Sequence, residues 1–318
     1  MPLVRWLINI IMDDIIRTDN LTKHFGKIHA VEDVSLTIGK GEIYGFLGLN
    51  GAGKTTTIRM LLGMIRHTSG EAYLNGKRVH SGNNELWSNV GYLVEMPYSY
   101  PDLTVKENLE IIRSLRFISD PGSVDSVIEK LRLAPYRDRI ARNLSLGNAQ
   151  RLGIAKAVIH NPDILILDEP ANGLDPAGIV EIREMLRDLA LNKGVTIFIS
   201  SHILGEISRF ATRIGIIHEG NLIQEADTEQ LDSFRYRRLQ IHVHDKDGAR
   251  SFLEKEGYPA IITKEGLLEI TNKEAMTHPE NVNSLLVYAG YLPTMLKIEE
   301  EDLESYFLRI IGNNGDIQ

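Results

Sequence analysis

The segment GLNGAGKTT over residues 48–56 is the feature that most constrains the fold of this chain. It fits the pattern G-x-x-x-x-G-K-[ST], in which glycines allow a tight loop whose backbone N–H groups surround phosphate oxygens. The apolar run EIYGFL at 42–47 precedes the loop, and the helical stretch TTIRMLLG follows it. This strand–loop–helix order predicts a nucleotide-phosphate site at a helix N-terminus, where the helix dipole favours anions.

The residues of this phosphate loop divide into side-chain and backbone roles. Lys54 is predicted to reach the β- and γ-phosphates, and so to take part in catalysis as well as in binding. The Thr55 hydroxyl is predicted to ligate Mg²⁺. The other loop residues are expected to bind ATP mainly through the backbone: Gly48, Leu49, Asn50, Gly51, Ala52, Gly53 and Thr56. The expected cofactors are therefore ATP and Mg²⁺.

Two further apolar runs end in polar residues. ILILDEP at 164–170 contains Asp168 and Glu169, and FISSH at 198–202 ends in His202. Ligands of open α/β sheets bind at the carboxyl ends of the strands, so we expect these side chains beside the phosphates. Asp168 is predicted to hold Mg²⁺ through water, Glu169 to polarise the attacking water, and His202 to contact the γ-phosphate and position that water.

The order of elements along the chain predicts an α/β fold with a largely parallel sheet. From residue 15 to about 230, short β-branched runs alternate with helical periods, with a mostly helical subdomain expected at about 96–160. The composition changes after residue 231, and strand and helix patterns in 231–318 predict a small α+β domain. Residues 1–14 would form an N-terminal extension.

Composition limits the compartment and the partners. A net charge of −8 argues against general nucleic-acid binding, and the absence of cysteine excludes disulfides and thiolate metal sites. The apolar run at 1–12 is too short to span a bilayer, and we expect a loose extension, with Met12 as a second candidate start, or a membrane-surface anchor. No other stretch approaches a transmembrane span, so a cytoplasmic location is expected.

Between the phosphate loop and the two acids lies LSLGNAQR at 144–151, and NGLD follows at 172–175. With these motifs in this order, the chain resembles the ATP-binding cassette (ABC) family over roughly residues 15–230. The resemblance implies a P-loop NTPase of ABC type, with an antiparallel β part beside the parallel core. It also implies an ATP-hydrolysing motor subunit that powers a separate integral membrane permease, lying at the inner face of the cell membrane through that permease.

The resemblance assigns further roles residue by residue. Ser145, Gly147 and Gln150 match the family signature, which contacts nucleotide held by the opposite subunit, and Asp175 matches the D-loop aspartate at the dimer interface. A second ATP-binding subunit is therefore implied, and a head-to-tail homodimer is expected. Phe25 lies near where the family places an aromatic ring against adenine, although a phenylalanine near a strand is also a common core residue.

Glu95, in GYLVEM, departs from the family pattern because most members carry glutamine at this position. A carboxylate can still ligate Mg²⁺ or accept a hydrogen bond from water, but it donates one only when protonated. Together with SLGNAQRLGIA, this glutamate resembles the bacitracin-resistance and lantibiotic-immunity branch, which implies export of a peptide antibiotic or drug. The alternative is a soluble, non-transport ABC ATPase such as one of iron–sulfur assembly.

Overall fold

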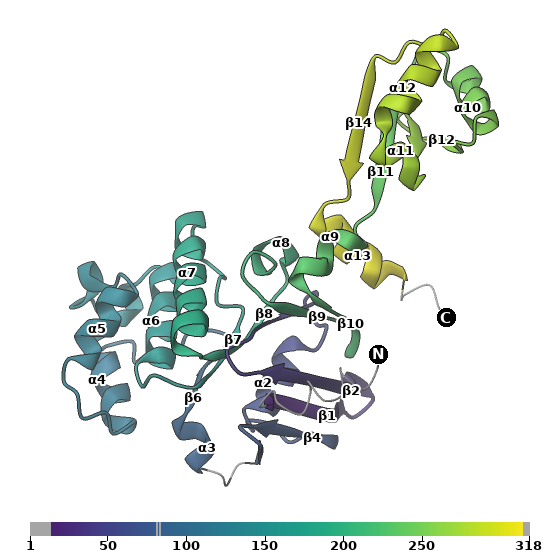
Figure 1. Ribbon diagram of the computed structural model, residues 1–318. Helices are drawn as coiled ribbons and strands as arrows, with labels where there is room; N and C mark the ends of the chain where they lie inside the picture. Colours follow the sequence, from purple (N-terminus) through teal and green to yellow (C-terminus); the bar gives the residue numbers. More distant parts are fainter. Residues whose placement is uncertain (1–13, 81, 83, 314–318) are drawn as a thin grey trace. The chain divides into compact units, whose positions relative to one another are not determined.

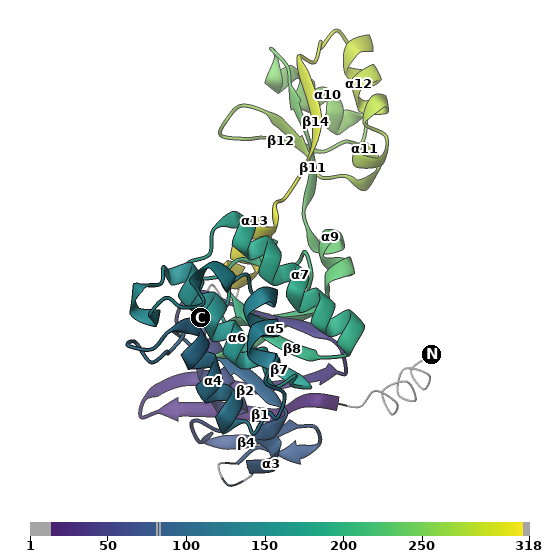
Figure 2. The ribbon, with the colours of Figure 1, turned by 90° about the vertical axis from the view of Figure 1, so that its left-hand side faces the viewer.

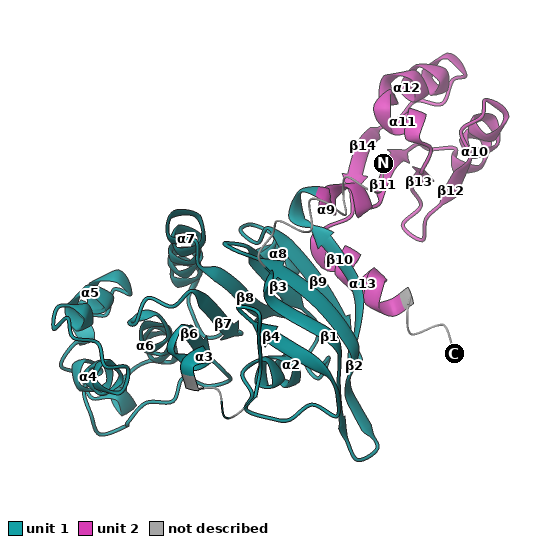
Figure 3. Ribbon diagram, turned by 60° about the horizontal axis from the view of Figure 1, so that its bottom comes forward, with its two compact units in different colours: residues 1–229 teal, residues 230–318 magenta. Residues whose placement is uncertain are grey.

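The structure is a computed structural model that describes residues 14–80, 82 and 84–313. It divides into two compact units, which Figure 3 colours separately, with the boundary between Glu229 and Gln230. Apart from Asp14, the extension expected over residues 1–14 lies outside the described residues.

The first unit is built on a six-stranded sheet in the order β10-β9-β3-β8-β7-β6. Five neighbouring strands run parallel, and only β10 is antiparallel to its neighbour. Every residue of β3, β7 and β8 is buried, as expected for strands covered on both faces. The strands are β3 (Ile43–Leu47), β6 (Val90–Leu93), β7 (Ile164–Asp168), β8 (Thr196–Ser201), β9 (Arg213–His218) and β10 (Asn221–Asp227).

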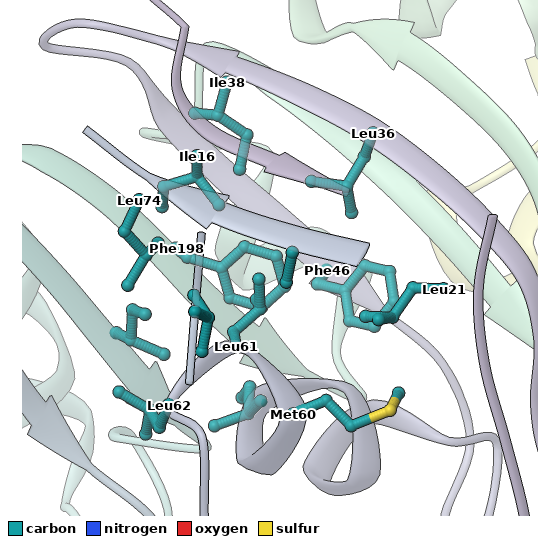
Figure 4. Packing of buried hydrophobic residues seen from close by; sticks show 14 of the residues in the cluster. Ile16, Leu21, Leu36, Ile38, Phe46, Met60, Leu61, Leu62, Leu74 and Phe198 are labelled. Atoms are coloured by element: carbon teal, nitrogen blue, oxygen red, sulfur yellow. The ribbon is translucent and has the colours of Figure 1, made fainter. Parts of the chain in front are cut away.

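An antiparallel sheet in the order β2-β1-β4-β5 forms a second layer of this unit. Its strands are β1 (Asp14–Phe25), β2 (Ile28–Gly39), β4 (Ser69–Leu74) and β5 (Lys77–Arg78). Apolar side chains of this sheet, of the parallel sheet and of helix α2 (Lys54–Leu61) share one core, as Figure 4 shows for Leu21, Leu36, Phe46, Leu61 and Phe198. This packing fixes the helix that follows the phosphate loop against both sheets.

Helices α4, α5 and α6 gather beside the parallel sheet, as Figures 1 and 2 both show. They belong to the segment between β6 and β7, so a helical region is inserted into the α/β order as predicted. Thr104 and Glu107 form a capping box that starts α4. After α2, the helices of this unit and of its boundary are α3 (Asn84–Ser88), α4 (Val105–Leu115), α5 (Ser123–Lys130), η1 (Ala134–Tyr136), η2 (Ala141–Asn143), α6 (Leu146–Val158), α7 (Pro176–Lys193), α8 (Leu204–Ile207) and η3 (Thr228–Gln230).

The second unit contains an antiparallel sheet in the order β12-β13-β11-β14 with its own apolar core. From β11 to β14 its order is β-α-β-β-α-β, with two helices in place of the second one, which is the order of a ferredoxin-like unit. The helices α9 and α13 flank this order on either side. The elements are α9 (Leu231–Phe234), β11 (Arg237–His242), α10 (Lys246–Lys255), β12 (Ala260–Ile262), β13 (Leu268–Ile270), α11 (Lys273–Thr277), α12 (Pro279–Tyr288), β14 (Met295–Glu300) and α13 (Leu303–Asn313). The predicted fold class is thus confirmed. Over the described part of the chain, every helix is too short or too polar to cross a bilayer.

Candidate functional site

The phosphate loop joins β3 to the N-terminus of α2, as the sequence predicts. Gly53 has φ 110°, a conformation that favours glycine, and a Cβ atom there would lie 2.6 Å from the carbonyl oxygen of Ala30 in β2. Glycine therefore lets the loop lie against β2. Lys54 is 6% exposed, and its Nζ donates to the carbonyl oxygens of Gly48 at 2.6 Å and Leu49 at 3.2 Å.

A chain of three hydrogen-bonding side chains lies beside the loop. The Thr55 hydroxyl donates to Oδ2 of Asp168 at 2.7 Å, and the Ser200 hydroxyl donates to Oδ1 of the same carboxylate at 2.6 Å. Asp168 ends the buried strand β7 and is 2% exposed, so the strand holds it rigidly. A hydroxyl and a carboxylate in contact are the hard oxygen donors that Mg²⁺ prefers, and this pair therefore fits a magnesium ion.

Glu169 stands between Lys54 and His202. Its Oε1 lies 3.2 Å from Lys54 Nζ, and its Oε2 lies 2.8 Å from His202 Nδ1. Glu169 has φ 48°, an unusual conformation for a residue other than glycine, and its N–H donates to the Ser200 hydroxyl at 2.9 Å. The structure therefore brings the residues predicted from three separate motifs to one edge of the parallel sheet.

Phe25 ends β1 at the turn of the β1–β2 hairpin and is 48% exposed. Its ring is not part of the core, and the Lys23 ammonium lies 4.8 Å from the ring centroid. The next strand, β2, carries Ala30, which touches the phosphate loop at Gly53. An exposed aromatic ring is thus available on the hairpin that abuts the loop, and the alternative of a core phenylalanine does not hold.

Glu95 does not join the Thr55–Asp168 pair. Its side chain is 55% exposed and forms an ion pair with Arg59, which lies on α2. Glu95 follows β6 with φ 59°. The predicted role of Glu95 as a magnesium ligand therefore has no contact to support it here. The sequence did not indicate Arg59 as its partner, because the partner lies on an element 36 residues away.

Ser145, Gly147 and Asp175 line a cleft of 640 Å³. Ser145 caps the N-terminus of α6, and Asp175 caps α7 by accepting from the Gly178 N–H at 3.0 Å. Among the described residues, no member of the loop 48–56 lines this cleft. Gln150 is placed differently from the other signature residues: it is 2% exposed, and its Nε2 donates to the Glu169 carbonyl oxygen of the same chain at 3.3 Å. Its side chain is therefore turned inward because α6 packs that face against the core.

A larger groove of 1070 Å³ lies where the chain leaves β6 and enters the helical region. Exposed apolar side chains stand on its rim, among them Met96 at 76%, Tyr98 at 77% and Phe117 at 93% exposure. Lys156 of α6 lies in this groove, and its Nζ donates to the Tyr98 carbonyl oxygen at 2.9 Å. Burial lowers the pKa of Lys156 to about 8.

A phosphate loop at a helix N-terminus, with a buried aspartate on the loop threonine and a glutamate held by lysine and histidine, defines a P-loop nucleotide hydrolase. The family model described as "ABC transporter" matches residues 31–172. The bacitracin transport ATP-binding protein BcrA of Bacillus licheniformis is 39% identical over 301 residues, which cover 95% of this chain and 98% of that protein. The chain therefore belongs to the ABC transporter family, as an ATP-binding subunit.

Other relatives and solved structures agree with this assignment. The lantibiotic transport ATP-binding protein SrtF of Streptococcus pyogenes is 37% identical over 67% of this chain and 90% of its own length. A solved ATP-binding subunit of an ABC transporter matches with a TM-score of 0.63 and 26% identity, over 69% of this chain and 92% of that chain. A dimeric bacterial ABC transporter cassette matches with a TM-score of 0.62 and 26% identity, over 67% of this chain and 98% of that chain.

Membership in the ABC transporter family establishes the general activity of the protein. The protein is a transport-coupled ATPase that binds ATP with Mg²⁺, and subunits of this family dimerise and work with membrane permeases. The prediction of an ABC motor subunit is confirmed, and the soluble iron–sulfur alternative is not favoured. Sequence reasoning missed Ser200 as the residue that holds both acids. The only signal for it was its place beside His202 at the end of a buried strand.

Proposed function

We propose that this protein powers a separate permease that exports a peptide antibiotic of the bacitracin class, or confers immunity to it. The observation that carries this proposal is the extent of the match to the bacitracin transport ATP-binding protein. Its 301 aligned residues exceed the 229 of the first unit, so the similarity continues into the second unit. The solved cassettes reported above match only 67–69% of the chain.

ATP binding is assigned to the phosphate loop and the hairpin. The backbone N–H groups of 48–56 surround the phosphates, and the Lys54 ammonium moves from the Gly48 and Leu49 carbonyl oxygens to the β- and γ-phosphates. The exposed ring of Phe25 stacks on the adenine. Release of Lys54 from Glu169 also frees that carboxylate, because the two groups form an ion pair in the structure.

The residues suited to Mg²⁺ are Thr55 and Asp168. The Thr55 hydroxyl would ligate the ion, and the Asp168 carboxylate, held by Ser200, would hold it through water. A bound Mg²⁺ supplies positive charge that balances the negative charge of the phosphate oxygens. Glu95 is assigned to the coupling between this site and the permease, since its carboxylate faces Arg59 and the apolar groove in the structure.

Hydrolysis is assigned to Glu169 and His202. Glu169 accepts a proton from the attacking water, and Ser200 fixes the position of Glu169 through its backbone N–H. His202 Nδ1 holds Glu169 Oε2 at 2.8 Å, which leaves the other ring nitrogen for the γ-phosphate. This contact between His202 and Glu169 supports the proposal that the base and the phosphate contact act side by side.

A head-to-tail homodimer completes the site. Ser145 and Gly147 open onto a cleft that lies apart from the phosphate loop of the same chain, so they suit nucleotide held by a second copy. Asp175 lines the same cleft and is assigned to the dimer interface. Gln150 is buried against Glu169, so we assign it to positioning that residue rather than to contact with the second subunit.

The apolar groove is assigned to the permease. Its lining is mostly apolar, with Met96, Tyr98 and Phe117 exposed, which suits an amphipathic helix on a cytoplasmic loop of a membrane protein. Tyr100 is 42% exposed, and its ring centroid lies 6.0 Å from that of Tyr98. Docking there would place this subunit at the inner face of the membrane.

The test is resistance in cells. A bacitracin-sensitive strain that expresses this protein together with a candidate permease is compared with the same strain carrying Glu169→Gln. The expected result is resistance with the unchanged protein only, together with retained ATP binding and a loss of turnover of about 100-fold or more in the purified variant. Equal resistance in both strains refutes the motor role. If neither strain is resistant while the unchanged protein has normal ATPase activity, the result refutes only the proposed peptide substrate and not the motor role.

A further inference from the structure

His24, His29 and Glu32 form a cluster on the β1–β2 hairpin that the ATPase mechanism does not use. His24 Nε2 lies 2.7 Å from Glu32 Oε2, and His29 Nδ1 lies 3.0 Å from the same oxygen. The two imidazole rings stack with centroids 3.9 Å apart at an interplanar angle of 20°. Within the described residues, this is the one group of three such side chains whose ligand atoms all lie within 4.8 Å of one another.

The backbone explains why these three side chains share a face. His24 and His29 are directly opposite each other on the two strands, so their side chains project to the same side. His29 and Glu32 are three residues apart and would lie on opposite faces of a regular strand. The pairing shifts from His24↔His29 to Lys23↔Val31, so β2 contains one extra residue, and this bulge returns Glu32 to the face of the histidines.

We propose that His24, His29 and Glu32 bind one divalent transition-metal ion, with Zn²⁺ as the first candidate. Two imidazoles and one carboxylate are a ligand set that suits Zn²⁺. Tetrahedral ligands at about 2.0–2.1 Å from the metal lie about 3.3 Å from one another. The two nitrogen–oxygen distances of 2.7 and 3.0 Å are shorter than that spacing, so binding would move His24 Nε2 and His29 Nδ1 outward from Glu32 Oε2. The two stacked rings would also rotate apart, so that both nitrogens face one ion. Their side chains are 29%, 62% and 34% exposed, so water can take the fourth position.

The metal site has a structural connection to the phosphate loop. Glu32 donates its backbone N–H to the Gly220 carbonyl oxygen at 2.9 Å, and the Gly220 N–H donates to the Ala52 carbonyl oxygen at 3.0 Å. The same ion would also join the two strands on either side of Phe25. A metal ion would therefore fix the hairpin that carries Phe25. Metal binding should therefore change the affinity for nucleotide, an effect that rests on the contact proposed above between Phe25 and adenine.

The first experiment titrates ZnCl₂ into the full chain, without a polyhistidine tag or nucleotide, and follows binding by calorimetry. The matched control is the double variant His242→Ala/His244→Ala, which removes another pair of neighbouring histidine rings. We expect one site per chain in the unchanged protein and in this control. His29→Ala and Glu32→Gln should each weaken that site by more than about tenfold. Equal Zn²⁺ affinity in all four proteins, or no binding, overturns the proposal.

The second experiment separates the site from its consequence. The affinity for a fluorescent ATP analogue is measured in excess Mg²⁺, with and without Zn²⁺, for the unchanged protein, His29→Ala and Phe25→Ala. We expect Zn²⁺ to change the affinity of the unchanged protein only. If Zn²⁺ binds but leaves the affinity unchanged, the link to the nucleotide is wrong. If Phe25→Ala binds the analogue as tightly as the unchanged protein, the adenine role itself fails, while the metal result stands.

Discussion

Replacing Ser200 with alanine should disturb both acidic residues of the ATP site at once. The Ser200 hydroxyl is fully buried, donates to Asp168 Oδ1 at 2.6 Å and accepts from the Glu169 N–H at 2.9 Å. A hydrogen bond to a charged group contributes about 1.5–3 kcal/mol, and a buried amide left without a partner costs about 1–3 kcal/mol. Because the two losses are coupled, we expect Ser200→Ala to lower the free energy of unfolding by about 2–4 kcal/mol.

The neighbouring Ser201→Ala substitution is the matched control. Ser201 is also buried, at 5% exposure, but its hydroxyl accepts only one neutral hydrogen bond, from the Ile203 N–H at 3.1 Å. Its loss should cost about 1 kcal/mol. Urea unfolding is followed by tryptophan fluorescence, because Trp87 packs against the apolar core of the first unit.

Turnover gives the second readout. A displaced Glu169 is no longer held beside the attacking water, and a shift of about 1 Å can lower turnover by about 100-fold. We therefore expect Ser200→Ala to lose ATPase activity while it still binds ATP through the phosphate loop. A destabilisation no larger than that of Ser201→Ala, with unchanged turnover, would refute the assignment of Ser200 as the residue that positions both acids.

Three further predictions concern pH, the helical region and coupling. Burial, and next the charge of Arg116, lower the pKa of His160 from 6.5 to about 4, so the unfolded state binds more protons between these values. The free energy of unfolding should therefore fall by about 1–2 kcal/mol as the pH drops from 6.5 to 4, after allowance for the partial exposure of the ring. Urea unfolding at each pH measures this fall, and His160→Gln should remove it. Asn108 is fully buried, and its side-chain amide donates to three carbonyl oxygens in 100–104. Asn108→Leu should therefore lower the free energy of unfolding by about 2–4 kcal/mol in the same assay. A loss smaller than that of Ser201→Ala would contradict the role of Asn108 in holding this segment. Glu95→Gln removes an exposed ion pair with Arg59, so ATP binding should be unchanged while permease-dependent transport changes; unchanged transport would exclude Glu95 from coupling.

The nucleotide site was the part of the protein that sequence predicted best. A phosphate loop depends on local backbone conformation, and its glycines and lysine stand within nine consecutive residues. The acids at the end of β7 and the histidine after β8 were also predictable, because parallel strands present their carboxyl ends at one edge. The proposed catalytic roles of these residues stay predictions for the experiments above.

Some contacts in the structure were not indicated by the sequence, because they join elements that are distant along the chain. Glu95 was expected at the metal, but Arg59 on α2 binds its carboxylate, and no pattern near Glu95 indicates that partner. Gln150 was grouped with the exposed signature residues, yet helical periodicity turns its side chain inward toward Glu169. The metal-ligand cluster on the hairpin was also hidden, because a bulge in strand pairing decides which residues share a face.

The sequence by itself determined the fold class, the phosphate loop and the membership in the ABC family, since these rest on apolar periodicity and on short motifs. Only the tertiary structure decided how the site is held together. Ser200 in β8 bridges Asp168 and Glu169 at the end of β7, and a bulge brings Glu32 to His24 and His29. The physical reason is that hydrogen bonds and metal sites need atoms within a few ångströms, and strand register and packing set those distances.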